Sequence, residues 1–208
     1  METAFRRYAA LEPFAVFLLI MAYIWDLRFS HQQFWMAILA WMLYSHRLHR
    51  EKVSALGFQS SNLRPCLEDF APAVILLALL LLGCGLLLQT TRPMGFDQAF
   101  LNWAGYLPWG VFQQYILNGY FFNRLDRLVS HRAAPMLSAA LFSGAHLPNW
   151  FLMGITFLAG YYSARIYQRH QNLYFLGLAH ATLGFLLYLV IPDSISHHLT
   201  VGPAWFRH

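Results

Sequence analysis

Three short stretches place polar side chains inside apolar segments of this 208-residue chain. The first carries Gln113, Gln114 and Asn118, the second ends at His146, and the third contains His180. An imidazole can accept a proton or bind a metal ion, and an amide can orient a water molecule or polarise a carbonyl group. Together these residue types predict a hydrolytic or ligand-binding site that contains no carboxylate.

The spacing within each stretch predicts which side chains share a helix face. Gln114 and Asn118 are four residues apart, so they can hydrogen-bond, and Phe142 and His146 share a face in the same way. Gln113 lies about 100° round the helix from Gln114 and points to a different neighbour. Polar residues in membrane bundles also serve only as interhelical hydrogen bonds, worth about 0.6 kcal/mol each, so both interpretations stay open.

The composition indicates the elements that must position these groups. The chain is 58% hydrophobic and only 11% charged, whereas soluble domains are about 25% charged. This deficit predicts an all-α, polytopic transmembrane bundle of about seven spans, with six to eight allowed, in a single membrane domain over residues 1–208. The apolar segments are roughly 13–25, 31–44, 70–89, 98–122, 134–149, 150–164 and 173–191.

Two prolines affect these boundaries. Pro148, followed by Asn149, predicts a tight turn between the fifth and sixth segments. Pro108 predicts either a kink in the fourth segment or a break that separates residues 98–107 from the rest. At about 1.5 Å per residue, the three polar stretches lie at similar depths, in the inner or middle part of a core about 30 Å thick.

The net charge of +5 does not indicate nucleic acid as a partner, because the basic residues sit at the ends of apolar runs. That pattern predicts a multi-pass protein of the lipid bilayer with a cytoplasmic N-terminus, in a bacterial inner membrane. The basic residues placed on the cytoplasmic side are Arg6, Arg7, Arg47, Arg50, Lys52, Arg64, Arg124, Arg127, Arg132, Arg165 and Arg169. We expect every acid to lie in a loop or at a span edge, and the loop histidines His46 and His49 to be solvated.

The ordered set of stretches resembles the CPBP family, which comprises CAAX-processing endopeptidases and bacteriocin-processing or immunity-associated membrane proteases. That family carries EExxxR, FxxxH and HxxxN on three successive helices. The corresponding stretches here are Gln113 to Asn118, Phe142 to His146, and His180 to Gly184, within a core of about residues 98–190. The flanking Leu147-Pro148-Asn149 is also similar to the family.

The resemblance implies an endopeptidase that acts on membrane-associated peptides or proteins. In the family, the first Glu activates a water molecule, the second pairs with the Arg, and the histidines and the Asn bind the water or a metal ion, or stabilise the oxyanion. Residue by residue, it implies catalytic roles for Gln113, Gln114, His146 and His180, a divalent metal ion at His146 and His180, and substrate contacts at Asn118, Phe142 and Asn149.

The chain departs from the family at the positions that carry charge. Gln113 and Gln114 replace both acids, Asn118 replaces the Arg, and Gly184 replaces the Asn. Gln cannot accept a proton to act as a general base. Because the acid and the Arg are lost together, neither leaves an unpaired buried charge behind.

Two functions stay open at this point. One is peptide-bond hydrolysis, with His146 or His180 as the base or with both bound to a metal ion, although a catalytic zinc usually has three protein ligands. The other is a catalytically inactive relative that uses no metal. Such a protein would bind a peptide, a lipid or a pigment in the former active site, or serve as a subunit or assembly partner of a larger membrane complex.

Overall fold

The computed structural model describes the backbone of residues 2–207 and the side chains of residues 10–207. The side chains of Arg6 and Arg7, which support the predicted cytoplasmic N-terminus, lie outside the described residues. Within residues 2–207 the regular structure is entirely helical, which confirms the predicted all-α class. The α-helices are α1 (Glu2–Ala22), α2 (Arg28–Ser30), α3 (Phe34–Leu48), α4 (Leu63–Leu87), α5 (Phe96–Gln114), α6 (Asn123–Leu125), α7 (Ala134–Gly144), α8 (Trp150–His170), α9 (Leu173–Val190) and α10 (Asp193–Ser196).

Five shorter helical stretches connect or end these helices. Two are π-helical and three are 3₁₀-helical, and in chain order they are η1 (Tyr23–Leu27), η2 (Val53–Leu56), η3 (Tyr115–Phe122), η4 (His197–Leu199) and η5 (Gly202–Arg207). Since η3 follows α5 directly and leads into α6, one helical rod runs from Phe96 to Leu125. The rod passes through Pro108 without interruption, so the predicted break before this proline is wrong.

Each predicted apolar segment corresponds to a helix, with shifted ends. Helix α4 begins at Leu63 rather than near residue 70, and α8 continues to His170 rather than ending near residue 164. Among the described residues, three helices are long and apolar enough to cross a membrane: Ala10–Ser30, Leu63–Leu87 and Leu173–Val190. The chain therefore has the character of a helical membrane bundle, and the count of seven spans stays a prediction.

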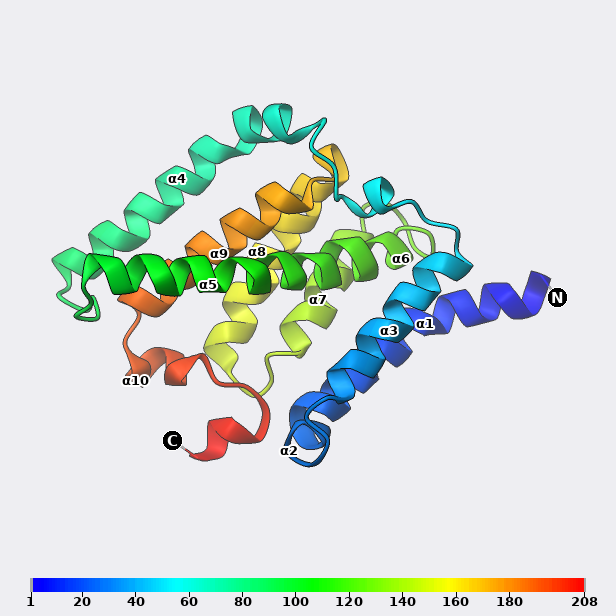
Figure 1. Ribbon diagram of the computed structural model, residues 1–208, viewed down its shortest axis with the longest axis horizontal. Coiled ribbons are helices and arrows are strands. Elements are labelled where there is room, and N and C mark those ends of the chain that lie inside the picture. Colours follow the sequence, from blue (N-terminus) through cyan, green and yellow to red (C-terminus); the bar gives the residue numbers. More distant parts are fainter. Residues whose placement is uncertain (1, 208) are drawn as a thin grey trace.

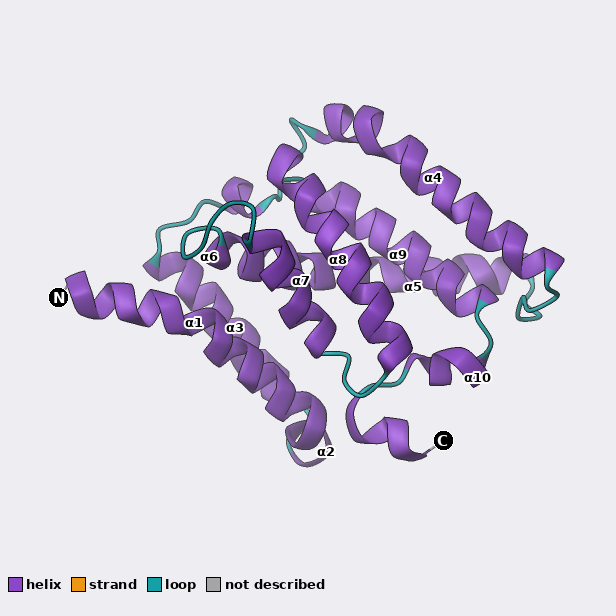
Figure 2. Ribbon diagram, turned by 180° about the vertical axis from the view of Figure 1, so that it is seen from behind, coloured by secondary structure: helices purple, strands orange, loops and turns teal. Residues whose placement is uncertain are grey.

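The bundle has a central layer with helices on either side. Helix α5 lies beside α9, α4 packs along α9, and α7 and α8 form a second closely packed pair (Figure 1). Helices α1 and α3 run side by side at the other edge of the molecule (Figure 2). The segment after α10 returns to the turn between α7 and α8, where the Gly202 amide donates to the Leu147 carbonyl over 2.8 Å.

Glycines allow α5 and α9 to touch through their backbones. A Cβ atom at Gly110 would lie 2.8 Å from the carbonyl oxygen of Gly177, and one at Gly177 would lie 2.8 Å from the Cα of Val111. Both distances are too short for a real side chain, so small residues at the crossing are a steric requirement. The close approach places the end of α5, with Gln114, against the middle of α9, with His180.

A cluster of ionisable residues is buried where α1 and α3 meet the far end of the rod. Glu12 of α1 is 2% exposed and accepts hydrogen bonds from Ser45, from His49 at 3.1 Å and from the Tyr120 hydroxyl at 2.7 Å. The Nε atom of Arg124 lies 3.6 Å from the same carboxylate. Glu12 is the third residue of the candidate span Ala10–Ser30, so it lies at a span edge as expected, and helix packing buries it there.

His46 belongs to the same cluster and is also buried, contrary to the solvated state expected from the sequence. Its Nδ1 atom donates to Glu51 over 2.5 Å, and its Nε2 atom accepts from the Tyr115 hydroxyl over 2.9 Å. Arg124 and Arg127 donate to the other oxygen of Glu51 over 2.6 and 2.5 Å. We call this set, Glu12, Ser45, His46, His49, Glu51, Tyr115, Tyr120 and Arg124, the charged cluster.

Candidate functional site

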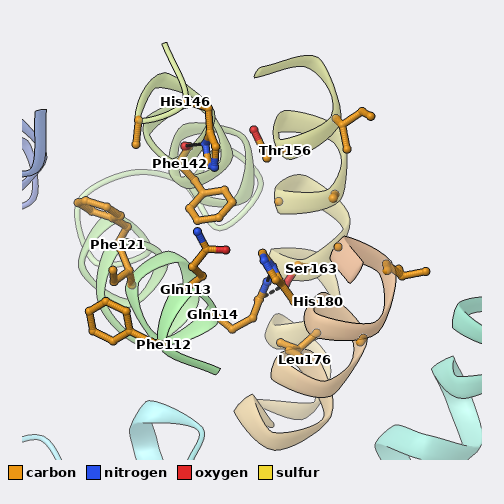
Figure 3. Close-up of a pocket in the computed structure, with 18 of the residues that line it drawn as sticks. Phe112, Gln113, Gln114, Phe121, Phe142, His146, Thr156, Ser163, Leu176 and His180 are labelled. Carbon is orange, nitrogen blue, oxygen red and sulfur yellow. Dashed lines mark hydrogen bonds between the residues drawn. The ribbon is translucent and has the colours of Figure 1, made fainter. Parts of the chain in front are cut away.

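Gln114 is the centre of a hydrogen-bond network between three helices. Its Oε1 atom accepts from Asn118 over 2.8 Å, which confirms the predicted pair, and from the Ser163 hydroxyl of α8 over 2.6 Å. Its Nε2 atom lies 3.0 Å from Nδ1 of His180 on α9 (Figure 3). Asn118 also donates to Ser163 over 2.9 Å. We call Gln114, Asn118, Ser163 and His180 the neutral cluster.

The partners of Gln114 determine the tautomer of His180. Because Oε1 already receives two donors, the Nε2 group must face His180 and donate to its Nδ1 atom. The neutral ring of His180 then carries its proton on Nε2 and offers a donor there. His146 has the opposite arrangement, because its Nδ1 atom lies 2.8 Å from the Phe142 carbonyl, which can only accept. Its Nε2 atom is therefore an acceptor.

The four residues predicted as catalytic line one cavity, together with Phe142. The cavity has a volume of about 1550 Å³ and is bordered by side chains from both halves of the bundle. The ring of Phe142 meets the His146 and His180 rings edge-on, at centroid separations of 5.1 and 6.3 Å. The amide of Gln113 points into the space between Phe142 and Gln114 (Figure 3). Tertiary packing thus brings all three sequence stretches together.

Asn118 and Asn149, predicted as substrate contacts, lie outside this lining. Asn118 is fully buried behind Gln114. Asn149 caps α8 by accepting from the Leu152 amide over 3.0 Å, and it donates to the carbonyls of Ser196 and Thr200 over 2.9 and 3.1 Å. These bonds occupy the whole side chain and hold the C-terminal segment in place. Both asparagines hold elements of the bundle together, and their contact with a substrate stays a prediction.

Tyr106 fills the space beside Gly184, the position that the resemblance aligns with the family's Asn. A Cβ atom at Gly184 would lie 3.0 Å from Cε1 of Tyr106 and 3.3 Å from its hydroxyl oxygen. The Tyr106 ring also lines the cavity and lies 6.3 Å from the His180 ring. Sequence reasoning did not identify Tyr106 or Ser163. Tyr106 is seven residues before Gln113, so it falls on nearly the same face of the helix as Gln113, and this spacing was the available signal.

The residues present do not fit a hydrolytic metal centre. No group of three His, Cys, Asp or Glu side chains able to hold a metal ion occurs among the described residues. The Nδ1 atom of His180 already accepts from Gln114, and the Nδ1 atom of His146 donates to a carbonyl. Two imidazoles without a carboxylate fall short of the three protein ligands usual at catalytic zinc.

Comparison with known proteins identifies the family of this region. Residues 96–186 match the family described as type II CAAX prenyl endopeptidase Rce1-like. The match contains Gln113, Gln114, His146, His180 and Gly184. No curated protein and no solved structure matches the chain. Residues 96–186 are therefore similar to the Rce1-like endopeptidase family, and they belong to a chain with the character of a helical membrane bundle.

Proposed function

We propose that this protein binds a membrane-associated peptide or protein segment in its cavity without hydrolysing it. The observation that carries this proposal is the set of hydrogen bonds made by the Gln114 side chain. At the position of the family's second Glu, its amide oxygen accepts from two neutral donors and its amide nitrogen donates to a neutral imidazole. Both ends of the Gln114 amide are hydrogen-bonded without a proton to transfer.

Hydrolysis by the family's chemistry needs a carboxylate that can take a proton from water. No Asp or Glu of the described chain lines the cavity. The buried acids Glu12 and Glu51 belong to the charged cluster, where arginine, histidine and hydroxyl donors hold their oxygens. Gln113, at the position of the first Glu, cannot replace them as a base.

The same lining suits the recognition of a peptide backbone. An extended segment brings N–H and C=O groups into an apolar cavity, where each costs free energy unless it finds a partner. His180 offers a donor at Nε2 and His146 an acceptor at Nε2. The Gln113 side chain makes no hydrogen bond to another described residue, so its amide can offer both a donor and an acceptor. We further propose a cytoplasmic N-terminus in a bacterial inner membrane, from the distribution of basic residues.

The test is to incubate the purified protein in nanodiscs with a panel of membrane-anchored peptides. Binding is followed by fluorescence anisotropy and cleavage by mass spectrometry. We expect saturable binding of at least one peptide, no cleavage above a protein-free control, and weaker binding by Gln113→Ala and Phe142→Ala. Cleavage by the wild type that His146→Ala abolishes would overturn the proposal.

One observation favours a second candidate, a histidine-based hydrolase. The bond from His146 Nδ1 to the Phe142 carbonyl fixes the ring and leaves Nε2 as an acceptor in the cavity, which is the arrangement of a general base. The pH dependence of cleavage tests it. A rate that rises with pH through a single transition, and is lost in His146→Ala but kept in Gln114→Ala, would support this alternative.

A further inference from the structure

One end of the cavity is cationic. Arg132, in the turn before α7, and Arg165 and Arg169, in the last turns of α8, all contribute to its lining. Arg165 and Arg169 are four residues apart, so they share a face of the helix. All three side chains are exposed. None of the three arginines forms a hydrogen bond with the neutral cluster, and nothing in the proposed peptide-binding function uses them.

None of these three guanidinium groups forms a salt bridge with a described residue. Arg165 donates to the neutral amide of Gln168 over 2.7 Å, and Arg169 lies over the Phe70 ring at 6.0 Å from its centroid. Four other arginines, Arg64, Arg92, Arg124 and Arg127, are each paired with a carboxylate. The positive charge at the end of the cavity is therefore uncompensated.

The nearby carboxylates are already paired with histidines. Asp126 accepts from His131 over 2.7 Å, and Asp69 accepts from His170 over 2.9 Å. Neither carboxylate forms a salt bridge with Arg132, Arg165 or Arg169. A ligand that neutralises Arg132, Arg165 and Arg169 must therefore carry a negative charge itself.

Next to the arginines, the cavity continues as an apolar strip between α4 and α8. Helix α4 lies along the edge of the bundle (Figure 2). The residues of the strip, all lining the same cavity, are Phe70, Ala73, Val74, Leu77 and Leu81 of α4 and Leu158, Tyr162 and Ile166 of α8. Leu77, Leu158 and Tyr162 are 47%, 59% and 64% exposed, so the strip is accessible from outside the protein.

We propose that this end of the cavity binds an anionic phospholipid, with its phosphate at Arg132, Arg165 and Arg169 and an acyl chain along the α4–α8 strip. Guanidinium groups form paired hydrogen bonds with phosphate oxygens, and basic side chains near a membrane surface attract anionic lipids. Charge complementarity selects an anion, and the adjoining apolar strip selects a lipid over free phosphate. The proposal does not depend on whether the neutral cluster binds or cleaves a peptide.

The experiment measures lipid retained by the full chain after extraction from bilayers of equal parts phosphatidylglycerol and phosphatidylcholine. The wild type should retain phosphatidylglycerol preferentially, as counted by native mass spectrometry. The triple variant Arg132→Gln, Arg165→Gln, Arg169→Gln should lose this retention by about tenfold or more. The matched control is Arg47→Gln, Arg50→Gln, Arg64→Gln, which removes the same charge from arginines that do not line the cavity. It should retain phosphatidylglycerol as the wild type does.

Three results would overturn the proposal. One is unchanged retention in the Arg132, Arg165, Arg169 variant, and another is an equal loss in the control, which would indicate general surface charge. The third is displacement of a fluorescent phosphatidylglycerol by glycerol 1-phosphate as effective as by the unlabelled lipid, which would show that the strip does not contribute.

Two further variants keep the test decisive. If the triple variant does not fold, the single changes at Arg165 and Arg169 are measured instead. Ala73→Trp, which fills the strip and leaves the arginines in place, should lower retention of phosphatidylglycerol with no change in net charge. Peptide binding, measured on the same samples, shows separately whether the proposed function holds.

Discussion

One helical rod contributes residues to both the neutral cluster and the charged cluster, yet the two clusters bury polar groups in different ways. Gln114 and Asn118 join the neutral cluster, where amides, a hydroxyl and an imidazole hydrogen-bond to one another. Tyr115, Tyr120 and Arg124 join the charged cluster, where carboxylates, histidines and an arginine are combined. The π-helical η3 contains most of these positions and turns successive side chains towards different neighbours.

The difference shows what each region can do. A buried charge is stable only when an opposite charge and hydrogen bonds meet it, and the charged cluster supplies both at the end of the rod. In the neutral cluster no arginine or carboxylate is present, so an unpaired acid there would have no counter-charge. The described chain therefore keeps its buried acids in the charged cluster, and the stretch around Gln113 and Gln114 is uncharged.

Removing the arginine of the charged cluster should have the largest effect. Arg124→Met leaves Glu12 and Glu51 buried without their main counter-charge, and we expect a loss of about 3–5 kcal/mol in the free energy of unfolding. Denaturant unfolding in detergent measures it. Arg64→Gln, which breaks an exposed pair with Glu68, should cost less than about 1 kcal/mol. Equal losses would contradict the contrast between buried and exposed pairs.

The charged cluster should also make stability depend on acid pH. Although burial alone would raise the pKa of Glu51, hydrogen bonds from His46 and Arg124 and the charges of Arg124 and Arg127 lower it from 4.5 to about 2. A carboxyl with a depressed folded-state pKa stabilises the fold above its unfolded pKa. That contribution, up to about 3 kcal/mol, is lost as pH falls from about 4.5 to about 2.

The check is the difference in unfolding free energy between wild type and Glu51→Gln across this pH window. We expect the difference to be largest above pH 4.5 and to shrink as pH falls towards 2, because the variant has no carboxyl to protonate. A difference that stays constant over the window would show that Glu51 is not held as an ion by the cluster.

The neutral cluster should depend on the close crossing of α5 and α9. Gly177→Ala places a Cβ atom against the backbone of Val111, so we expect a loss of about 1–3 kcal/mol in unfolding free energy. Gly83→Ala in α4 is the matched control, because nothing lies within 4 Å of its Cβ position. It should be neutral or stabilise slightly. If both changes had the same effect, the crossing would not be sterically restricted.

A double-mutant cycle at Gln114 and Asn118 tests whether the neutral cluster tolerates a buried charge only when an opposite charge is added. Gln114→Glu replaces the donor that faces His180 by an acceptor and adds a buried charge, which should cost about 1–3 kcal/mol. Adding Asn118→Arg should recover part of the loss, with a coupling of about 0.5–3 kcal/mol. Thermal unfolding of the four proteins gives the coupling energy. Purely additive effects would show that the two positions do not interact.

The sequence determined the helices and the uncharged character of the site. Apolar runs predict helices whatever their neighbours, and the spacing of Gln114 and Asn118 predicts their hydrogen bond, because both features are local to one helix. The three stretches around Gln113, His146 and His180 were also visible as polar residues in apolar surroundings. These features require no knowledge of how the helices pack.

Only the tertiary structure decided the partners. Ser163 reaches Gln114 from 49 positions away, and Tyr120 reaches Glu12 from 108, so no local pattern indicates either pair. A charged residue at the edge of an apolar run looks the same in sequence whether water or an opposite charge meets it, and this is why the charged cluster was missed. Helix packing creates those contacts, because long-range burial is a property of the assembled bundle.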